Sequence, residues 1–284
     1  MEPKKILDYN YKQLNTSLKY SVIMPIHNQE RIIAEVLDRV YKNTVGKYEL
    51  ILILDNCTDN TEQIVLEKVL NTPKNLKRIQ IFKYDQPVFE TTCDNFGFKL
   101  AEGVYLVEVQ ADIFIYTYGY NKILTEPFRK YNDVISVSGR GIHGMFKINE
   151  GYGKLGGDID LPLRSGFDNY DTFYVGDTCI RGPWALEKEK AEKLDYLDEV
   201  NFVLGGDDHD INVRVFLKYG WVCGYVPIEI KSPLAEGSTR KQRDEINTNA
   251  LEQRRRASNG GVLQKVYNGE IAYTEKGVLR RSLL

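Results

Sequence analysis

The sequence predicts an α/β fold, in which helices flank a doubly wound and mainly parallel central sheet. Between residues 20 and 112, short apolar stretches rich in Val, Ile and Leu alternate with stretches whose apolar residues recur at helical spacing. An apolar stretch can end in polar turn residues, as at Asp55-Asn-Cys-Thr58. Strands that alternate with helices in this way pair in parallel. A length of 284 residues allows one large domain or two small ones, and we expect a single domain.

The expected elements follow from local patterns. Residues 20–26 form an apolar stretch with Pro25 near its end, where a missing N–H matters least, and this stretch predicts the first strand. Asn28 and Glu30 suit the start of a helix whose apolar residues lie between 32 and 40. Further strands are expected at 49–54, 77–84, 103–112, 133–138, 175–183 and 221–227. Further helices are expected at 61–70, 91–102, 113–132, 184–194 and 211–219.

The composition argues against two classes of protein. A formal net charge of −2 argues against a protein that binds nucleic acid mainly by electrostatic attraction. No stretch of about 18 consecutive apolar residues occurs, so we expect no membrane span, and the first residues lack the apolar run of a signal peptide. The four cysteines form no Cys-x-x-Cys pair, which indicates reduced thiols. We therefore expect a cytoplasmic protein, and any association with a membrane would be peripheral.

The segment Glu108-Val-Gln-Ala-Asp112 ends an apolar stretch that begins at Gly103. Ligands of open α/β sheets bind outside the carboxyl ends of the strands. A carboxylate at that place, beside the amide of Gln110, suits a divalent cation held against a diphosphate, because hard cations prefer oxygen ligands and share carboxylates with substrate phosphates. The alternative is a strand that ends in a solvated turn aspartate.

Three further carboxylates crowd the expected start of a helix, at Asp207, Asp208 and Asp210. A helix amino terminus favours anions, while neighbouring like charges raise the pKa of at least one of them. A raised pKa helps a carboxylate to act as a general base near neutral pH. The alternative is N-capping by one acid, with the other two solvated.

Four stretches, in this order, resemble the GT-A type glycosyltransferases, most closely the large inverting family 2. Residues 22–30 are similar to the family's opening strand and loop, and 54–61 are similar to its second-strand turn. Residues 95–112 are similar to the helix and strand that lead to its DXD motif, and 206–220 are similar to its later E-D-x-D signature. The resemblance departs from the pattern where Gln110 replaces the first acid of DXD, where Leu54 replaces an acid before Asp55, and where Asp207 replaces a glutamate.

The resemblance implies a fold and a reaction. The fold would be GT-A, and a sugar would move with inversion, by direct displacement, from a nucleoside-diphosphate sugar to an acceptor hydroxyl. We favour a UDP-sugar as donor, and the acceptor would be a glycan or a lipid-linked or protein-linked group. A divalent cation, Mn²⁺ or Mg²⁺, would bind the diphosphate through Asp112, although Gln110 puts its affinity and identity in doubt.

The resemblance also implies roles for individual residues. Asp208 would be the general base, with Asp207 beside it, and Asp112 would be the metal ligand. His209 and His143 are further candidate metal ligands, but surface histidines are the expected alternative. The nucleotide would be bound by Pro25, His27, Glu30, Asp55, Gln110 and Asp112. The acceptor would be bound by Arg181, Gly182, Trp184 and Asp210. For Asp55 the alternative is capping of the next turn, and for Trp184 it is a place in the core.

The chain divides accordingly. Residues 1–19 are expected to be a surface lead-in. Residues 20–232 would be the glycosyltransferase domain, with a nucleotide-binding half at 20–112 and an acceptor and catalytic half at 113–232. The Gly-rich part from 139 to 172 would be a lid that excludes water. Residues 233–284 would be a basic tail on or near the site, in which the arginines at 254–256 are a solvated run or a basic lid over the diphosphate.

Two other functions compete with this hypothesis. A nucleotidyltransferase also binds nucleotides on a doubly wound sheet, but it would carry a Gly-rich G-x-G-T/S-R loop where this chain has Pro25-Ile-His-Asn-Gln-Glu30. A non-catalytic sugar-nucleotide-binding protein is compatible with Gln110. The pair Asp207 and Asp208 argues against that alternative.

Overall fold

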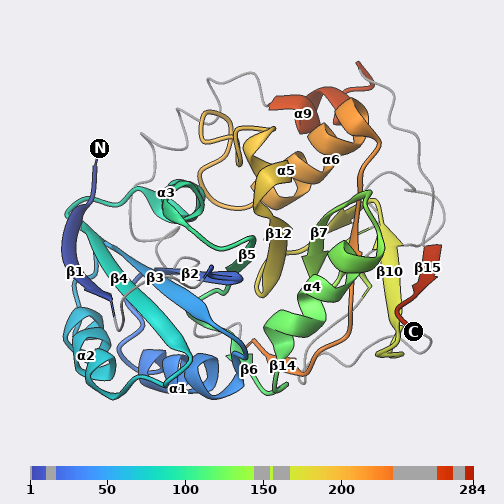
Figure 1. The fold of residues 1–284 in the computed structure, drawn as a ribbon. Coiled ribbons are helices and arrows are strands. Elements are labelled where there is room, and N and C mark those ends of the chain that lie inside the picture. Colours follow the sequence, from blue (N-terminus) through green and yellow to red (C-terminus); the bar gives the residue numbers. More distant parts are fainter. Residues whose placement is uncertain (1, 11–16, 144–153, 156–166, 233–260, 271–278) are drawn as a thin grey trace.

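The computed structural model describes residues 2–10, 17–143, 154–155, 167–232, 261–270 and 279–284, and its centre is a ten-stranded mixed sheet (Figure 1). The strand order is β1-β4-β3-β2-β5-β12-β7-β13-β10-β15. In chain order these strands are β1 (Lys4–Asn10), β2 (Tyr20–Ile26), β3 (Tyr48–Asp55), β4 (Leu76–Tyr84), β5 (Tyr105–Glu108), β7 (Val134–Ser138), β10 (Thr172–Gly176), β12 (Trp184–Glu187), β13 (Val222–Tyr225) and β15 (Leu279–Ser282). A small three-stranded sheet has the order β11 (Thr178–Cys179), β8 (Ile142–His143) and β9 (Lys154–Leu155). A two-stranded sheet is formed by β14 (Ile230–Lys231) and β6 (Phe114–Ile115).

The pairing confirms the predicted doubly wound sheet. Strands β4, β3, β2 and β5 pair in parallel, and β7 pairs in parallel with β13. The chain runs outward from β2 through β3 to β4 and then returns to place β5 on the other side of β2. Such a reversal of strand order creates a crevice at the carboxyl ends of the two strands that flank it. The fold therefore prepares a site between the ends of β2 and β5.

Helices cover both faces of the sheet, as Figure 1 shows. One apolar layer joins the sheet to α1, α2 and α4, and a second joins its other face to α3, α5 and α6. Gly97 allows α3 to lie close against β2, because a Cβ there would lie 2.5 Å from Ile23 Cγ2. The helices are α1 (Ile33–Asn43), α2 (Thr61–Lys68), α3 (Phe89–Leu100), α4 (Tyr120–Lys130), α5 (Lys188–Glu192), α6 (Asp207–Tyr219) and α9 (Gly261–Tyr267), with a 3₁₀ turn at Val69–Asn71.

Two predicted helices are wrong in part. The expected helix at 184–194 begins as strand β12, because Ala185 and Leu186 pair with β5 on one side and β7 on the other. A central position in the sheet thus overrides the local pattern, and only α5 is helical. The expected helix at 113–132 begins at Tyr120, after the short strand β6.

The two ends of the chain add edge strands to the sheet. Within the expected lead-in, β1 pairs antiparallel with β4, and near the carboxyl end β15 pairs antiparallel with β10. Helix α9 contacts α6. The arginines at 254–256 and most of the expected lid at 139–172 lie outside the described residues.

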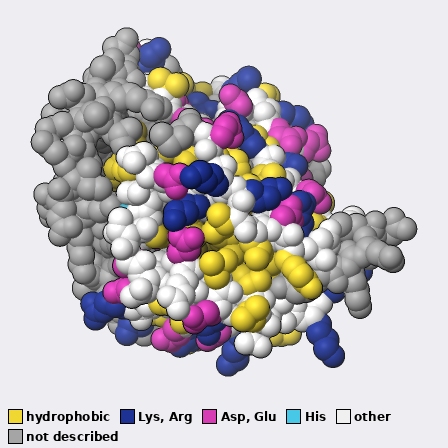
Figure 2. Space-filling view, turned by 90° about the vertical axis from the view of Figure 1, so that its left-hand side faces the viewer, with side chains coloured by type: hydrophobic (Ala, Val, Ile, Leu, Met, Phe, Trp, Pro, Cys, Tyr) yellow, Lys and Arg dark blue, Asp and Glu magenta, His cyan; other side chains and the backbone are white. Residues whose placement is uncertain are grey.

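The outer surface beside β1 carries mixed charge. Figure 2 shows Lys and Arg side chains interspersed with Asp and Glu around a group of hydrophobic side chains. Arg78 of β4, for example, pairs with Asp8 of β1 at 2.9 Å and with Glu102 at 2.5 Å. Among the described helices, none is long and apolar enough to cross a membrane.

Candidate active site

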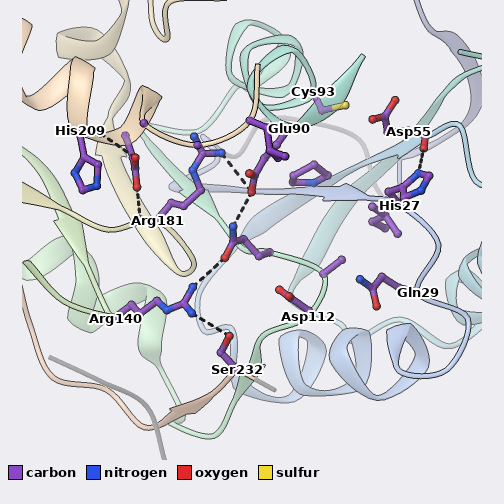
Figure 3. A pocket seen from close by; sticks show the side chains of 18 residues that line it. His27, Gln29, Asp55, Glu90, Cys93, Asp112, Arg140, Arg181, His209 and Ser232 are labelled. Carbon is purple, nitrogen blue, oxygen red and sulfur yellow. Dashed lines mark hydrogen bonds and ion pairs between the residues drawn. The ribbon is translucent and has the colours of Figure 1, made fainter. Parts of the chain in front are cut away.

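A pocket of about 340 Å³ lies where the carboxyl ends of β2 and β5 meet the amino-terminal turns of α3 and α6 (Figure 3). This is the crevice that the strand order creates, and its volume is at the lower end of the range of about 300–1,000 Å³ that small-molecule sites occupy. The lining residues are Pro25, Ile26, His27, Gln29, Asp55, Glu90, Cys93, Gln110, Ala111, Asp112, Arg140, Arg181, Leu204, Gly205, Gly206, Asp208, His209 and Ser232.

Many of the predicted site residues meet in this pocket. They come together because strands that pair in parallel present their carboxyl ends at one edge of the sheet, and because β12 and α6 begin at the same edge. The predicted residues that line the pocket are Pro25, His27, Asp55, Gln110, Asp112, Arg181 and Asp208.

Glu30, which the sequence predicts to bind the nucleotide, is not among the residues that line this pocket. Its exposed carboxylate accepts hydrogen bonds from the backbone N–H and the side-chain amide of Asn60, at 3.0 and 2.9 Å. It therefore ties the loop after β2 to the start of α2.

Trp184 and Asp210, expected to bind the acceptor, also lie away from the pocket. Trp184 is 1% exposed and packs edge to face on Phe98, with ring centroids 6.4 Å apart, so it is a core residue. Asp210 pairs with Arg214 at 2.6 Å and accepts the backbone N–H of Leu263 of α9 at 3.3 Å, so it holds α6 and α9 together.

Arg181 is the centre of a buried acidic cluster that we call the Arg181 cluster (Arg181, Glu90, Asp94, Glu108, Asp207 and Asp208). Its Nη1 lies 2.7 Å from Asp94 Oδ2 and 3.3 Å from Glu90 Oε1, and its Nη2 pairs with Asp207. Its backbone N–H donates to Asp208 Oδ2 at 3.2 Å, and the next N–H, of Gly182, donates to Glu108 Oε2 at 3.0 Å. Gly182, which the sequence predicts to bind the acceptor, is not among the residues that line the pocket.

The pKa values in this cluster follow from burial and crowding. Burial raises the pKa of Glu108 to about 8, and the nearby charges of Glu90 and Asp207 act in the same direction against the opposing charge of Arg181. Burial likewise raises the pKa of Glu90, and it raises the pKa of Asp94 well above its ordinary value. One guanidinium therefore cannot keep all of these carboxyls ionised at neutral pH.

Asp208 differs from its neighbours, and in a direction opposite to the one expected from like-charge crowding. Burial opposes its ionisation, but the charges of His209 and Arg181 and the backbone N–H bonds from both residues outweigh burial and lower its pKa. The pKa of Asp210, by contrast, is raised, chiefly by burial. Asp208 is thus ionised at neutral pH.

Asp55 shapes the wall of the pocket next to the end of β2. Its carboxylate accepts the backbone N–H groups of Val88 and Phe89, both at 2.9 Å, immediately before Glu90 enters the pocket. The Asp55 carbonyl accepts the Nδ1–H of His27. Burial raises the pKa of the Asp55 carboxyl against the two N–H bonds. Asp55 therefore orders a turn, here the one at the start of α3, as the alternative interpretation of the sequence proposed. Each of its carboxylate oxygens can still accept a further hydrogen bond from a ligand.

A hydrogen-bonded row crosses the pocket and includes residues that the sequence reasoning missed. Gln110 Nε2 donates to Glu90 Oε1 at 2.6 Å, and Arg140 Nη1 donates to Gln110 Oε1 at 3.3 Å (Figure 3). Arg140 Nη2 continues the row to Ser232 Oγ at 3.1 Å. A basic residue between two glycines directly after the apolar stretch 133–138 was a usable signal for Arg140. Glu90 had no such signal, because its place depends on the distant Asp55.

Carboxylates of the pocket offer the oxygen ligands that a divalent cation prefers. Asp112 lines the pocket and supplies a carboxylate there. The carboxylates of Glu90, Asp94 and Glu108 have oxygens within 4.8 Å of one another, but Arg181 already pairs with two of them. His209 lines the pocket with its Nδ1 2.8 Å from Thr178 Oγ1. Asp112 is a candidate protein ligand for a cation that is shared with substrate oxygens.

Solved structures share this fold. The structure of Staphylococcus aureus TarS 1–349 in complex with UDP-GlcNAc has a TM-score of 0.52 and 19% identity, and the match covers 74% of this chain and 56% of that one. The mannosyltransferase PcManGT from Pyrobaculum calidifontis, in complex with GDP-Man and Mn²⁺, has a TM-score of 0.55 and 18% identity, with 75% and 56% covered. The fold is that of the GT-A glycosyltransferases.

Sequence comparison gives the family. The family model described as Glycosyl transferase family 2 matches residues 21–193, and the chain belongs to that family. The poly(ribitol-phosphate) beta-N-acetylglucosaminyltransferase TarS of Staphylococcus aureus is 31% identical over 135 residues, which are 45% of this chain and 22% of TarS. The chain spans less than a third of the length of curated relatives such as TarS.

Proposed function

We propose that the chain is an inverting glycosyltransferase that moves a sugar from a UDP-sugar to an acceptor hydroxyl. The observation that carries this proposal is the meeting, in one pocket, of the ends of β2 and β5 with the ionised Asp208 at the start of α6. UDP is favoured as the leaving group because TarS, which shares the fold and part of the sequence, is solved with UDP-GlcNAc.

The lining residues divide between the parts of the donor. Pro25, His27 and Asp55 form the wall at the end of β2 and β3, where a planar base would lie. Asp55 would accept a ring N–H, and its buried carboxylate is fixed by the N–H groups of Val88 and Phe89. Gln110 and Asp112 form the wall at the end of β5, where the diphosphate would lie.

Asp208 would perform the proton transfer. Its carboxylate would accept the proton of the acceptor hydroxyl while the hydroxyl oxygen attacks the anomeric carbon and the bond from that carbon to the diphosphate oxygen breaks. The backbone N–H groups of Arg181 and His209 hold the two carboxylate oxygens, at 3.2 and 2.9 Å. Asp207 would act indirectly, because it is fully buried, pairs with Arg181 and accepts the Thr91 hydroxyl at 2.7 Å.

The leaving diphosphate needs a positive charge near it. A Mn²⁺ or Mg²⁺ ion would supply Lewis-acid stabilisation of that group, with Asp112 as its protein ligand. Gln110 is fixed by Glu90 and Arg140, so it would contact the donor as a neutral amide. Arg181 lines the same pocket and would lie beside the acceptor.

The acceptor and the cellular location are further parts of the proposal. The name of TarS specifies a poly(ribitol-phosphate) acceptor. A hydroxyl of a polyol-phosphate polymer is therefore the first acceptor to test, among the glycan, lipid-linked and protein-linked acceptors that the sequence suggests. We expect the reaction to take place in the cytoplasm.

A thermal-shift panel of UDP, GDP, CMP and dTDP, each with and without Mn²⁺, tests the proposal. A ligand that binds only the folded state raises the apparent melting temperature by mass action. We expect UDP to give the largest shift and Asp112→Asn to remove any increment due to Mn²⁺. A larger shift with GDP would indicate that the donor is a GDP-sugar and not a UDP-sugar. No shift with any nucleotide would contradict the proposed function.

A further inference from the structure

We propose that Arg140 binds the diphosphate of the donor directly, and that Gln110 keeps its guanidinium available for this contact. The inference rests on the proposed function, because it assumes that a nucleoside diphosphate occupies the pocket. It assigns to side chains of this protein a share of the charge neutralisation that a cation would otherwise supply alone.

Arg140 is a buried cation that has no counter-charge among the described residues. The residue is 8% exposed and lines the pocket, yet no carboxylate lies within ion-pair distance of it in the part of the chain that the structure describes. Its contacts are neutral ones, to Gln110 Oε1 at 3.3 Å and to Ser232 Oγ at 3.1 Å. Its buried Nε has no acceptor among the described residues. Because an unpaired buried charge is costly, this side chain is built to receive an anion.

Arg181 makes the contrast clear within the same pocket. It is 4% exposed and pairs with Glu90, Asp94 and Asp207. Its charge is committed to the protein's own acids, so it has little to offer a phosphate. Among the described residues, Arg140 pairs with neutral groups, so its charge is available to a ligand.

The place of Arg140 suits the diphosphate. The Ser138 hydroxyl accepts the backbone N–H groups of Arg140 and Gly141, both at 2.9 Å, and so fixes the turn after β7. Figure 3 shows Arg140, Ser232 and Asp112 on one side of the pocket. A planar guanidinium can donate two parallel hydrogen bonds to phosphate oxygens, which a lysine cannot.

Gln110 explains why the charge of Arg140 remains free. Its Oε1 accepts a hydrogen bond from the guanidinium of Arg140, and its Nε2 donates one to the carboxylate of Glu90. A carboxylate at this position would form an ion pair with Arg140 and would repel Glu90. Gly182 makes room for this arrangement, because a Cβ there would lie 2.4 Å from Gln110 Oε1. Because the side chain of residue 110 is a neutral amide, it does not neutralise the charge of Arg140.

Calorimetric titration of the whole chain with UDP and with uridine, in EDTA and in Mn²⁺, tests the inference. We expect the wild type to bind UDP more tightly than uridine in EDTA. Arg140→Gln should weaken UDP binding in EDTA roughly 10- to 100-fold, the range expected for charge-assisted hydrogen bonds. It should leave uridine binding within about 2-fold. Arg140→Lys should show an intermediate loss. Arg129→Gln removes an exposed arginine that pairs only with Glu126 in the described structure, and it should change neither affinity.

The Gln110→Glu variant tests the coupling. It should weaken UDP binding in EDTA nearly as much as Arg140→Gln, and Mn²⁺ should recover more of the affinity than it does in Arg140→Gln. Melting temperatures of each variant establish that it is folded. Equal UDP affinity of wild type and folded Arg140→Gln in EDTA would overturn the inference while the proposed function stands. Failure of the wild type to bind UDP or uridine under either condition would overturn both.

Discussion

Replacing Arg181 by glutamine removes the only guanidinium that contacts the buried acids of the Arg181 cluster in the described structure. The side chain pairs with Glu90, Asp94 and Asp207 and is itself 4% exposed. Glutamine retains a hydrogen-bonding end but carries no charge. The acids would then be left buried without a counter-ion, and we expect a large loss of folding stability that depends on pH.

The magnitude follows from the burial of the pair. Removing one partner of a buried ion pair costs about 3–5 kcal/mol of the free energy of unfolding. Three pairs do not cost three times as much, because Glu90 and Asp94 already have raised pKa values and can take up protons in the variant. We therefore expect about 3–5 kcal/mol in total near pH 8, which is a large part of the roughly 5–15 kcal/mol that stabilises a domain.

The direction of the pH dependence is fixed by linkage. Without Arg181, the folded-state pKa values of Glu90 and Asp94 rise further above their unfolded values. The folded variant then retains protons that the unfolded chain has released, so its stability falls as the pH rises from the unfolded pKa to the folded one. The loss relative to the wild type should be smaller at pH 5.5 than at pH 8.5.

Urea unfolding followed by circular dichroism at these two pH values measures the effect. Arg129→Gln is the matched control, because its arginine is half exposed and pairs with Glu126 across one helical turn; we expect it to cost less than about 0.5 kcal/mol. A loss below about 1 kcal/mol for Arg181→Gln at pH 8.5, or a loss that does not change with pH, would refute the charge-balance argument.

Three further predictions concern single carboxyls. Because the pKa of Glu108 is about 8 in the folded state, against an ordinary value of 4.5, wild-type stability should fall with rising pH between these values. Its slope should be at most about 1.4 kcal/mol per pH unit for this proton, and urea midpoints of Glu108→Gln should show a smaller slope. Asp55→Ala leaves two buried N–H groups without their acceptor and should cost about 2–4 kcal/mol in urea unfolding, whereas Asp55→Asn, which retains one acceptor, should cost less. Because the pKa of Asp208 is lowered, kcat/KM should not fall between pH 7 and pH 5 through its protonation; a fall centred near pH 6 that persists in His209→Gln would contradict this assignment.

Much of the pocket could be predicted from the sequence, because its main parts are local. Asp55, Asp112 and Asp208 each stand where an apolar stretch ends or a helix begins, and parallel strands bring such positions to one edge of the sheet. The predicted roles of these residues remain proposals. Their common location follows from the order of strands and helices alone.

The parts that could not be predicted depend on contacts between distant segments. Trp184 begins a strand because β5 and β7 leave a place for one between them, which no local pattern reveals. Glu90 enters the pocket because Asp55 fixes the turn before it, and the pKa of Asp208 is lowered by His209 and Arg181 rather than raised by its acidic neighbours. Arg140 could have been noticed as a basic residue after a strand. That no carboxylate of the described ranges pairs with it is visible only in three dimensions.

The central claim is that Asp208 transfers a proton in a pocket that binds a nucleoside-diphosphate sugar. The most direct measurement is UDP release from a UDP-sugar by wild type and Asp208→Asn, in the presence of a polyol-phosphate acceptor, together with the UDP affinity of both. The account predicts that the variant binds UDP within about 3-fold of the wild type and loses at least about 100-fold in turnover. Turnover of the folded variant equal to that of the wild type would contradict the account.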